Sequence, residues 1–415
     1  MAILKPFKGF RPKKEFARQI ASRPYDVLSS EEARKLVKDN PYSFLHVIKP
    51  EVDLPKDIDI HSNKVYEKGR ENLMKFIDDG IFFEDPEPCF YIYAQSFQNK
   101  TQYGILGCAH IDDYENNKIK KHELTMPDKE LDRINIIKHH KFHAEPVFFT
   151  YQDNEEINNA VKIITQNEPE YTFDAIDEIG HHFWVVDDKD MIKLLEDKFK
   201  NDIPCTYVAD GHHRTAAAAK VALEQKQNNP NHTGKEDYNY FMAVHFPASH
   251  LQIIDYNRVI KDLNGNSASQ FIEKLKNNFH LEEKGSNEYK PSVLHEFSMY
   301  IEGKWYALKA KEGMFNDNDP INCLDVTILS NHILGPVLDI TDLRKSTRID
   351  FVGGIRGLSE LKKRVDSGKM KVAFALYPVS MEQLINIADT DNIMPPKTTW
   401  FEPKLRSGLV IHSFG

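Results

Sequence analysis

The stretch from Ala209 to Ala219 restricts the fold of this 415-residue chain more than any other. Residues 203–208, just before it, are apolar and partly β-branched, which is typical of a strand. Residues 215–222 are rich in alanine, the strongest helix former, and predict a helix. The segment therefore predicts a strand that leads through a short turn into the start of a helix. Such a helix start carries unpaired backbone N–H groups and a partial positive charge, so it can bind an anion.

The residue types in this turn favour phosphate chemistry. Arg214 offers a planar fork that suits two parallel hydrogen bonds to a phosphate. Asp210 is the only acid of the turn, and its oxygens suit Mg²⁺ or a substrate hydroxyl. Helix capping by Asp210 beside surface histidines is the alternative interpretation. We expect Asp210 and His213 to be catalytic, with Asp210 as the metal ligand and the following phosphate-binding set: Gly211, His212, His213, Arg214 and Thr215.

Hydrophobic periodicity and turn residues predict an α+β protein with a mixed sheet, since many strands lie outside a simple βαβ order. Ser29 and Glu32 form a capping box that starts a helix. Residues 43–48 are expected to be a strand and residues 62–79 an amphipathic helix. By region, we expect a core over 1–264, a small appended α+β unit over 265–320, and a C-terminal region over 321–415 that packs back on the core.

Composition narrows the class of protein. The net charge of −9 argues against nucleic acid as a partner, because binding to phosphate backbones needs a basic face. No apolar run is long enough to span a bilayer, and the first residues lack the apolar core of a signal peptide. The four cysteines are scattered without metal or redox spacing, so buried reduced thiols and a cytoplasmic location are expected. The oligomeric state stays open.

Several motifs together resemble one family. They are Pro24-Tyr25-Asp26-Val27, Asn40-Pro41-Tyr42, His46-Val47-Ile48-Lys49-Pro50-Glu51, Lys120-Lys121-His122-Glu123-Leu124-Thr125, Tyr256-Asn257-Arg258-Val259 and the segment from Met394 to Lys404. The chain is identified by them as a member of the family called domain of unknown function 1015. The 210–215 turn is also similar to the phosphate-binding box of ParB-type CTPases, sulfiredoxins and free-serine kinases.

This resemblance implies a ParB/sulfiredoxin-like core and a small-molecule kinase. Its substrate would be free L-serine, its product O-phospho-L-serine, its donor pyrophosphate or ATP, and its cofactor Mg²⁺. The alternative is a non-catalytic nucleotide-binding switch of the ParB type. The acidic balance and the lack of a helix-turn-helix candidate count against that alternative.

The resemblance also bears on the proton acceptor that phosphoryl transfer to a hydroxyl needs. Serine kinases of this superfamily use a glutamate from the N-terminal part of the fold, which selects Glu51, a carboxylate that follows a predicted strand and a proline. A surface turn carboxylate is the other interpretation of Glu51. Glu123 is the second candidate for the base, although it could simply pair with neighbouring lysines.

Three further residues are candidates for substrate binding. Arg258 and Asn257 follow a predicted strand, and Arg258 could hold a substrate carboxylate. Lys397 lies in an extended, proline-rich segment and could contact phosphate. Zinc is not expected, because His139 and His143 have ligand spacing on a helix but lack the glutamate of a zinc-protease motif.

Overall fold

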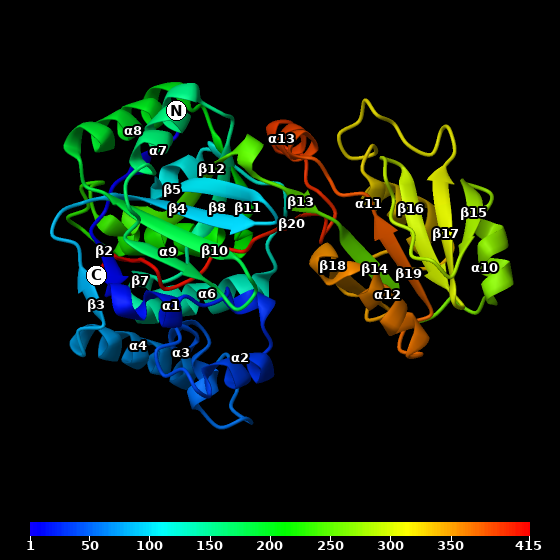
Figure 1. The fold of residues 1–415 in the computed structure, drawn as a ribbon, viewed down its shortest axis with the longest axis horizontal. Coiled ribbons are helices and arrows are strands. Elements are labelled where there is room, and N and C mark those ends of the chain that lie inside the picture. Colours follow the sequence, from blue (N-terminus) through cyan, green and yellow to red (C-terminus); the bar gives the residue numbers. More distant parts are fainter. The chain divides into compact units, whose positions relative to one another are not determined.

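The computed structural model describes residues 1–415, and the chain divides into two compact units (Figure 1). Unit 1 comprises residues 1–121, 125–251 and 403–415, and unit 2 comprises residues 122–124 and 252–402. The main segment of unit 2 begins at residue 252, whereas the sequence analysis expected a boundary at 264. Residues 265–402 belong to one unit rather than two, and only the last thirteen residues of the expected C-terminal region return to unit 1.

Unit 1 is built on a nine-stranded mixed sheet. Eight strands follow in the order β6 (Ile119–Lys120), β11 (Thr206–Asp210), β8 (Val147–Tyr151), β12 (Tyr240–Pro247), β5 (Lys100–His110), β4 (Phe90–Phe97), β10 (Gly180–Val186) and β9 (Tyr171–Asp174), and β1 (Leu4–Lys5) pairs with β5. The β6–β11 and β8–β12 pairs are parallel and the other pairs antiparallel. The predicted mixed α+β class is confirmed.

A second, four-stranded sheet joins both ends of the chain. Its order is β3 (Phe82–Glu84), β2 (Gly9–Pro12), β21 (Ile411–Ser413) and β7 (Phe142–His143). The helices of unit 1 are α1 (Ala17–Ile20), α2 (Ser30–Val37), α3 (Leu45–Ile48), α4 (Asn63–Asp78), α5 (Ile111–Glu115), α6 (Pro127–His140), α7 (Glu155–Ile164), α8 (Lys189–Asp202) and α9 (His212–Asn228). None of the helices in the chain combines the length and apolar character of a membrane span.

The alanines of α9 explain how this helix lies against the sheet. Ala217 and Ala218 are buried with Val208 of β11 and Phe241 of β12 in one apolar cluster. Small side chains allow the helix backbone to approach the strands closely, and α9 is therefore held by packing along its first turns. This packing fixes where the N-terminus of α9 lies.

Unit 2 contains a six-stranded antiparallel sheet. Its order is β15 (Phe279–Gly285), β17 (Lys304–Ala310), β16 (Glu296–Ile301), β19 (Val372–Leu376), β14 (Tyr256–Ile260) and β18 (Ile349–Gly353), with β13 (Ile253–Ile254) pairing with β20 (Trp400–Phe401). Its helices are α10 (Ala268–Leu275), α11 (Asp325–Leu329) with a following π-helical turn (Ser330–Leu334), α12 (Gly357–Asp366) and α13 (Met381–Asp389).

Several local expectations are confirmed and one is wrong. Ser29 caps α2 in a reciprocal capping box with Glu32, and the helix expected over 62–79 is α4. The strand expected over 43–48 is instead α3, followed by a 3-10 turn over Pro50–Asp53. Its apolar residues are buried on every side in the cluster beneath the four-stranded sheet. A short apolar run of this kind fits a buried helix as well as a buried strand.

Candidate functional site

The predicted strand–turn–helix is confirmed in unit 1. β11 ends at Asp210, and α9 begins at His212. Gly211 lies between them with φ +98°, a backbone conformation that favours glycine. An added Cβ at Gly211 would lie 3.1 Å from Cγ1 of Val147 and 3.2 Å from Nη2 of Arg214. Glycine thus serves two needs here, because it permits both the turn and the close approach of these two side chains.

Arg214 points into the protein rather than out of the turn. Its Nη1 donates a hydrogen bond to the carbonyl oxygen of Pro146, and its Nη2 lies 3.8 Å from Oδ2 of Asp210. Burial lowers the pKa of Arg214, but the carboxylates of Glu145 and Asp210 outweigh this effect and raise it. Arg214 therefore supports the turn through contacts inside the protein. Its direct contact with phosphate stays a prediction. Thr215 is buried, and its Oγ1 donates to the carbonyl oxygen of Gly211 at 3.0 Å.

Lys404 is a site residue that the sequence analysis missed. Its Nζ lies 3.2 Å from Oδ2 of Asp210, and its carbonyl oxygen accepts a hydrogen bond of 2.9 Å from Nε2 of Gln95. Burial raises the pKa of Asp210, but the charges of Lys404 and Arg214 outweigh this effect and hold the pKa below its ordinary range. The only sequence signal was the position of Lys404 at the end of the family motif that starts at Met394.

The two histidines of the turn have different surroundings. His212 is buried, whereas His213 is partly exposed. Nε2 of His213 accepts a hydrogen bond of 3.0 Å from the backbone N–H of Met126, so this nitrogen carries no proton in that arrangement. A catalytic role for His213 stays a prediction.

Mg²⁺ was predicted to bind Asp210. The turn supplies one carboxylate, and both of its described ion pairs use Oδ2. Mg²⁺ commonly binds one or two carboxylates and takes its other ligands from substrate phosphates and water. The donor set fits an ion that arrives with a phosphorylated ligand, and it does not form a closed protein cage.

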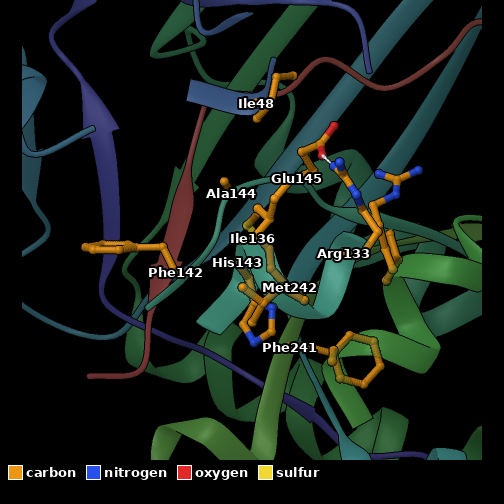
Figure 2. Close-up of a pocket in the computed structure, with 13 residues that line it drawn as sticks. Ile48, Arg133, Ile136, Phe142, His143, Ala144, Glu145, Phe241 and Met242 are labelled. Carbon is orange, nitrogen blue, oxygen red and sulfur yellow. Dashed lines mark hydrogen bonds and ion pairs between the residues drawn. The ribbon is translucent and has the colours of Figure 1, made fainter. Parts of the chain in front are cut away.

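Arg214 is one of the residues that line a small cavity of about 30 Å³. Figure 2 shows this cavity with its lining residues. Arg133 and Glu145 face each other on its wall, with Nη1 of Arg133 3.3 Å from Oε2 of Glu145. Burial raises the pKa of Glu145, although Arg214 and Arg133 oppose this effect. The volume allows about one or two ordered water molecules. The cavity is therefore part of the support for the turn and too small for a substrate.

The Pro-Tyr-Asp-Val motif joins this support. The backbone N–H of Tyr25 donates to Oε1 of Glu145 at 3.2 Å. The Tyr25 ring centroid lies 3.5 Å from Cζ of Arg133, which is a cation–π contact. Arg133 also pairs with Asp132. The motif thus holds the Arg133–Glu145 pair in place under the 210–215 turn.

Glu51 is buried, which excludes the interpretation as a solvated turn carboxylate. Its side chain is only 6% exposed, and its Oε1 lies 3.0 Å from Nζ of Lys49 and 2.7 Å from Oγ of Ser30. Ile48, at the end of α3, lines the same small cavity as Arg214. The segment that carries Glu51 is therefore adjacent to the support of the turn. Its role as general base stays a prediction, as does that of Glu123, which belongs to unit 2.

The three expected substrate-binding residues all lie in unit 2. Nη2 of Arg258 donates to the carbonyl oxygen of Lys397 at 2.9 Å, so the structure brings these two residues together. Asn257 is buried and engaged with its neighbours, since its Nδ2 donates to Asp255 and its Oδ1 accepts from the N–H of Leu376. Asn257 thus orders β14 and β19, and substrate binding by all three stays a prediction.

A larger hollow of about 660 Å³ lies elsewhere in unit 1, between the turn before β4 and α8. Arg11 and Asp85 lie on its wall and form a buried ion pair of 2.7 Å. None of the expected site residues lines this hollow. In the sheet, four strands separate β11, which carries Asp210, from β10 beside the hollow.

Comparison with known proteins confirms the family. The family described as "Protein of unknown function (DUF1015)" matches residues 4–327, and the chain belongs to it. No curated protein matches the chain. The description of the family assigns no activity.

Solved structures give only a distant likeness. A conserved hypothetical protein from Pyrococcus furiosus is 15% identical, with 74% of this chain and 95% of that chain covered and a TM-score of 0.36. A free serine kinase in complex with AMP is 13% identical, with 74% of this chain and 92% of that chain covered and a TM-score of 0.35. SbnI with a C-terminal truncation from Staphylococcus aureus is 10% identical, with 73% of this chain and 85% of that chain covered and a TM-score of 0.38. Scores of this size establish neither a shared fold nor a shared activity, and the ParB/sulfiredoxin-like character of the core stays a prediction.

Proposed function

We propose that the protein transfers a phosphoryl group from pyrophosphate or ATP to free L-serine. The serine hydroxyl oxygen bonds to the transferred phosphorus, its proton passes to a general base, and orthophosphate or ADP leaves. The observation that carries this proposal is the N-terminus of α9, where Gly211 is the N-cap and Lys404 contacts the preceding residue, Asp210. The acceptor comes from the resemblance of the turn to that of free-serine kinases.

The N-terminus of α9 supports binding of a phosphate. The helix spans seventeen residues and has no side-chain cap at Gly211, so that residue satisfies none of the first-turn N–H groups through a side chain. Asp210 is the one acid of the turn and is held between Lys404 and Arg214. Arg214 is also compensated by Glu145, so Lys404 is the cation of this pair that we propose for binding an anion.

Lys404 is proposed as the cation that reaches the phosphate, while Arg214 holds the turn. The side chain of Lys404 is 15% exposed and has a flexible stem, so its ammonium can exchange Asp210 for a phosphate oxygen. Mg²⁺ would bind the donor and one oxygen of Asp210. Glu51 is proposed as the base, with Glu123 as the second candidate.

The direct test measures the product. The full chain is incubated with L-serine, Mg²⁺ and, in separate reactions, pyrophosphate or ATP, and O-phospho-L-serine is measured by mass spectrometry. We expect product with at least one donor and loss of most of it in Asp210→Asn, because asparagine keeps the size of the side chain but loses the charge that Lys404 and Mg²⁺ would bind. Binding of a donor without phosphoserine in any reaction would overturn the proposal and favour the nucleotide-binding switch.

A matched pair of lysine variants tests the helix terminus. Lys404→Met should raise the KM for the donor about tenfold or more, because a charge-assisted contact with phosphate is lost. Lys198→Met on α8 is the control, since Lys198 pairs with Glu156 and Asp202 instead. Equal donor KM values in the two variants would remove Lys404 from the site.

A further inference from the structure

The buried arginines of this chain differ in one respect. Five are buried, namely Arg11, Arg133, Arg214, Arg258 and Arg406. Four of them form an ion pair with a carboxylate. Arg258 forms none, although it is the most buried of the five at 1% exposure.

The surroundings of Arg258 explain why the chain cannot neutralise it. Arg258 lies on β14 and donates hydrogen bonds to the carbonyl oxygens of Tyr256 and Lys397, with its Cζ 5.5 Å from the Phe351 ring centroid. Asp255 is close in sequence, but its carboxylate is engaged by Lys290 at 3.3 Å and by Nδ2 of Asn257. The described hydrogen bonds and ring contact of the guanidinium therefore all involve neutral groups.

A buried charge without an opposite charge nearby is unfavourable for the free energy of folding. Moving a charged group out of water is unfavourable, and folded proteins usually offset this with an opposite charge. Burial lowers the pKa of Arg258 to about 10, and no carboxylate counteracts this. The group nonetheless stays protonated at neutral pH. Arg258 is therefore a buried cation for which the chain supplies no paired carboxylate.

The segment over residues 390–399, which includes Lys397, contacts Arg258 and bears on whether an anion can bind there. Residues 390–399 contain no helix or strand, and Lys397 within them is exposed and has φ +61°. One of the bonds that hold the guanidinium goes to the carbonyl oxygen of this residue. Because β14 pairs with β18 and β19, exchange of that carbonyl for an oxyanion would break no strand pairing of β14. Nζ of Lys397 lies 5.7 Å from the Tyr256 ring centroid, so a second cation is at hand.

We propose that Arg258 and Lys397 form an oxyanion-binding site in unit 2. Its ligand is a small molecule that carries a carboxylate or a phosphate monoester, because a guanidinium presents two parallel donors to either group. The site is independent of the proposed phosphoryl transfer, since it rests on residues of unit 2 alone.

The test uses the full chain, with acetate, L-serine and orthophosphate as separate probes. Hydrogen exchange measured by mass spectrometry reports on peptides that cover residues 392–402 and β14. We expect at least one probe to change exchange in both segments, with a binding constant weakened about tenfold to a hundredfold in Arg258→Met. Unchanged exchange in the wild-type protein with all three probes would overturn the proposal.

Two further variants separate this site from the α9 terminus and from simple charge loss. Arg348→Met is the matched control in unit 2, because Arg348 pairs with Asp262 at 2.5 Å, and it should leave the exchange response intact. Lys404→Met should also leave it intact. Loss of the response in Lys404→Met alone would show that the anion binds at the α9 terminus and not at Arg258. If Arg258→Met does not fold, Arg258→Lys replaces it, with weakened binding expected and wild-type binding refuting the proposal.

Discussion

Replacing Arg214 with methionine distinguishes two roles of this residue, structural support of the 210–215 turn and direct binding of phosphate. The substitution keeps most of the side-chain volume and removes the charge and the hydrogen bond to Pro146. Breaking a buried ion pair costs about 3–5 kcal/mol when the partner is left alone. Here Arg133 still faces Glu145 and Lys404 still faces Asp210, so we expect about 3 kcal/mol. For a unit of this size that corresponds to a drop of about 6–12 °C in Tm.

Thermal unfolding followed by circular dichroism at pH 7 measures this drop. The control is Arg23→Met, whose guanidinium pairs with Asp177 while its side chain is 45% exposed. Such a surface pair contributes about 1 kcal/mol at most. If Arg214→Met melts together with Arg23→Met and only donor binding falls, the guanidinium serves the ligand and the inward position described above is wrong.

Three further outcomes are expected. Gly211→Ala should destabilise the protein by at least about 1 kcal/mol in urea unfolding, since its φ of +98° excludes an ordinary side chain; unchanged stability would show that the turn adapts. Glu51→Gln should lower turnover about 10²–10⁴-fold with donor binding retained, and full turnover would remove it as the base. Burial lowers the pKa of His140 and His143 to about 3 and that of His412 well below its ordinary value. Stability should therefore fall below pH about 6.5 by about 1.4 kcal/mol per pH unit for each histidine, because only the unfolded chain takes up the proton. A flat urea midpoint from pH 7 to 5 would refute this.

Features encoded in neighbouring residues could be predicted from the sequence. The capping box at Ser29, the amphipathic helix α4 and the turn at Gly211 each depend on residues within one or two turns of the chain. The segment 43–48 could not be assigned, because its apolar side chains are buried on all sides and carry no period.

The direction of a side chain depends on distant residues, and this limited what the sequence could show of the site. The guanidinium of Arg214 is held by Pro146, which is 68 positions away along the chain. Lys404 reaches Asp210 across 194 positions. Neither partner can be recognised from the turn itself. The sequence analysis therefore assigned Arg214 to phosphate binding and gave Lys404 no role.

The two cations next to Asp210 differ in a way that decides which of them can respond to a ligand. Arg214 is fixed by its bond to Pro146 beneath the turn, and its planar group cannot turn outward without leaving Glu145 less compensated. Lys404 has a compact ammonium on a flexible stem, and its side chain is 15% exposed. In the proposed reaction, an incoming phosphate would therefore compete with Asp210 for Lys404 rather than for Arg214. Such an exchange would leave an oxygen of Asp210 for Mg²⁺ that arrives with the donor, and donor binding would then be coupled to metal binding.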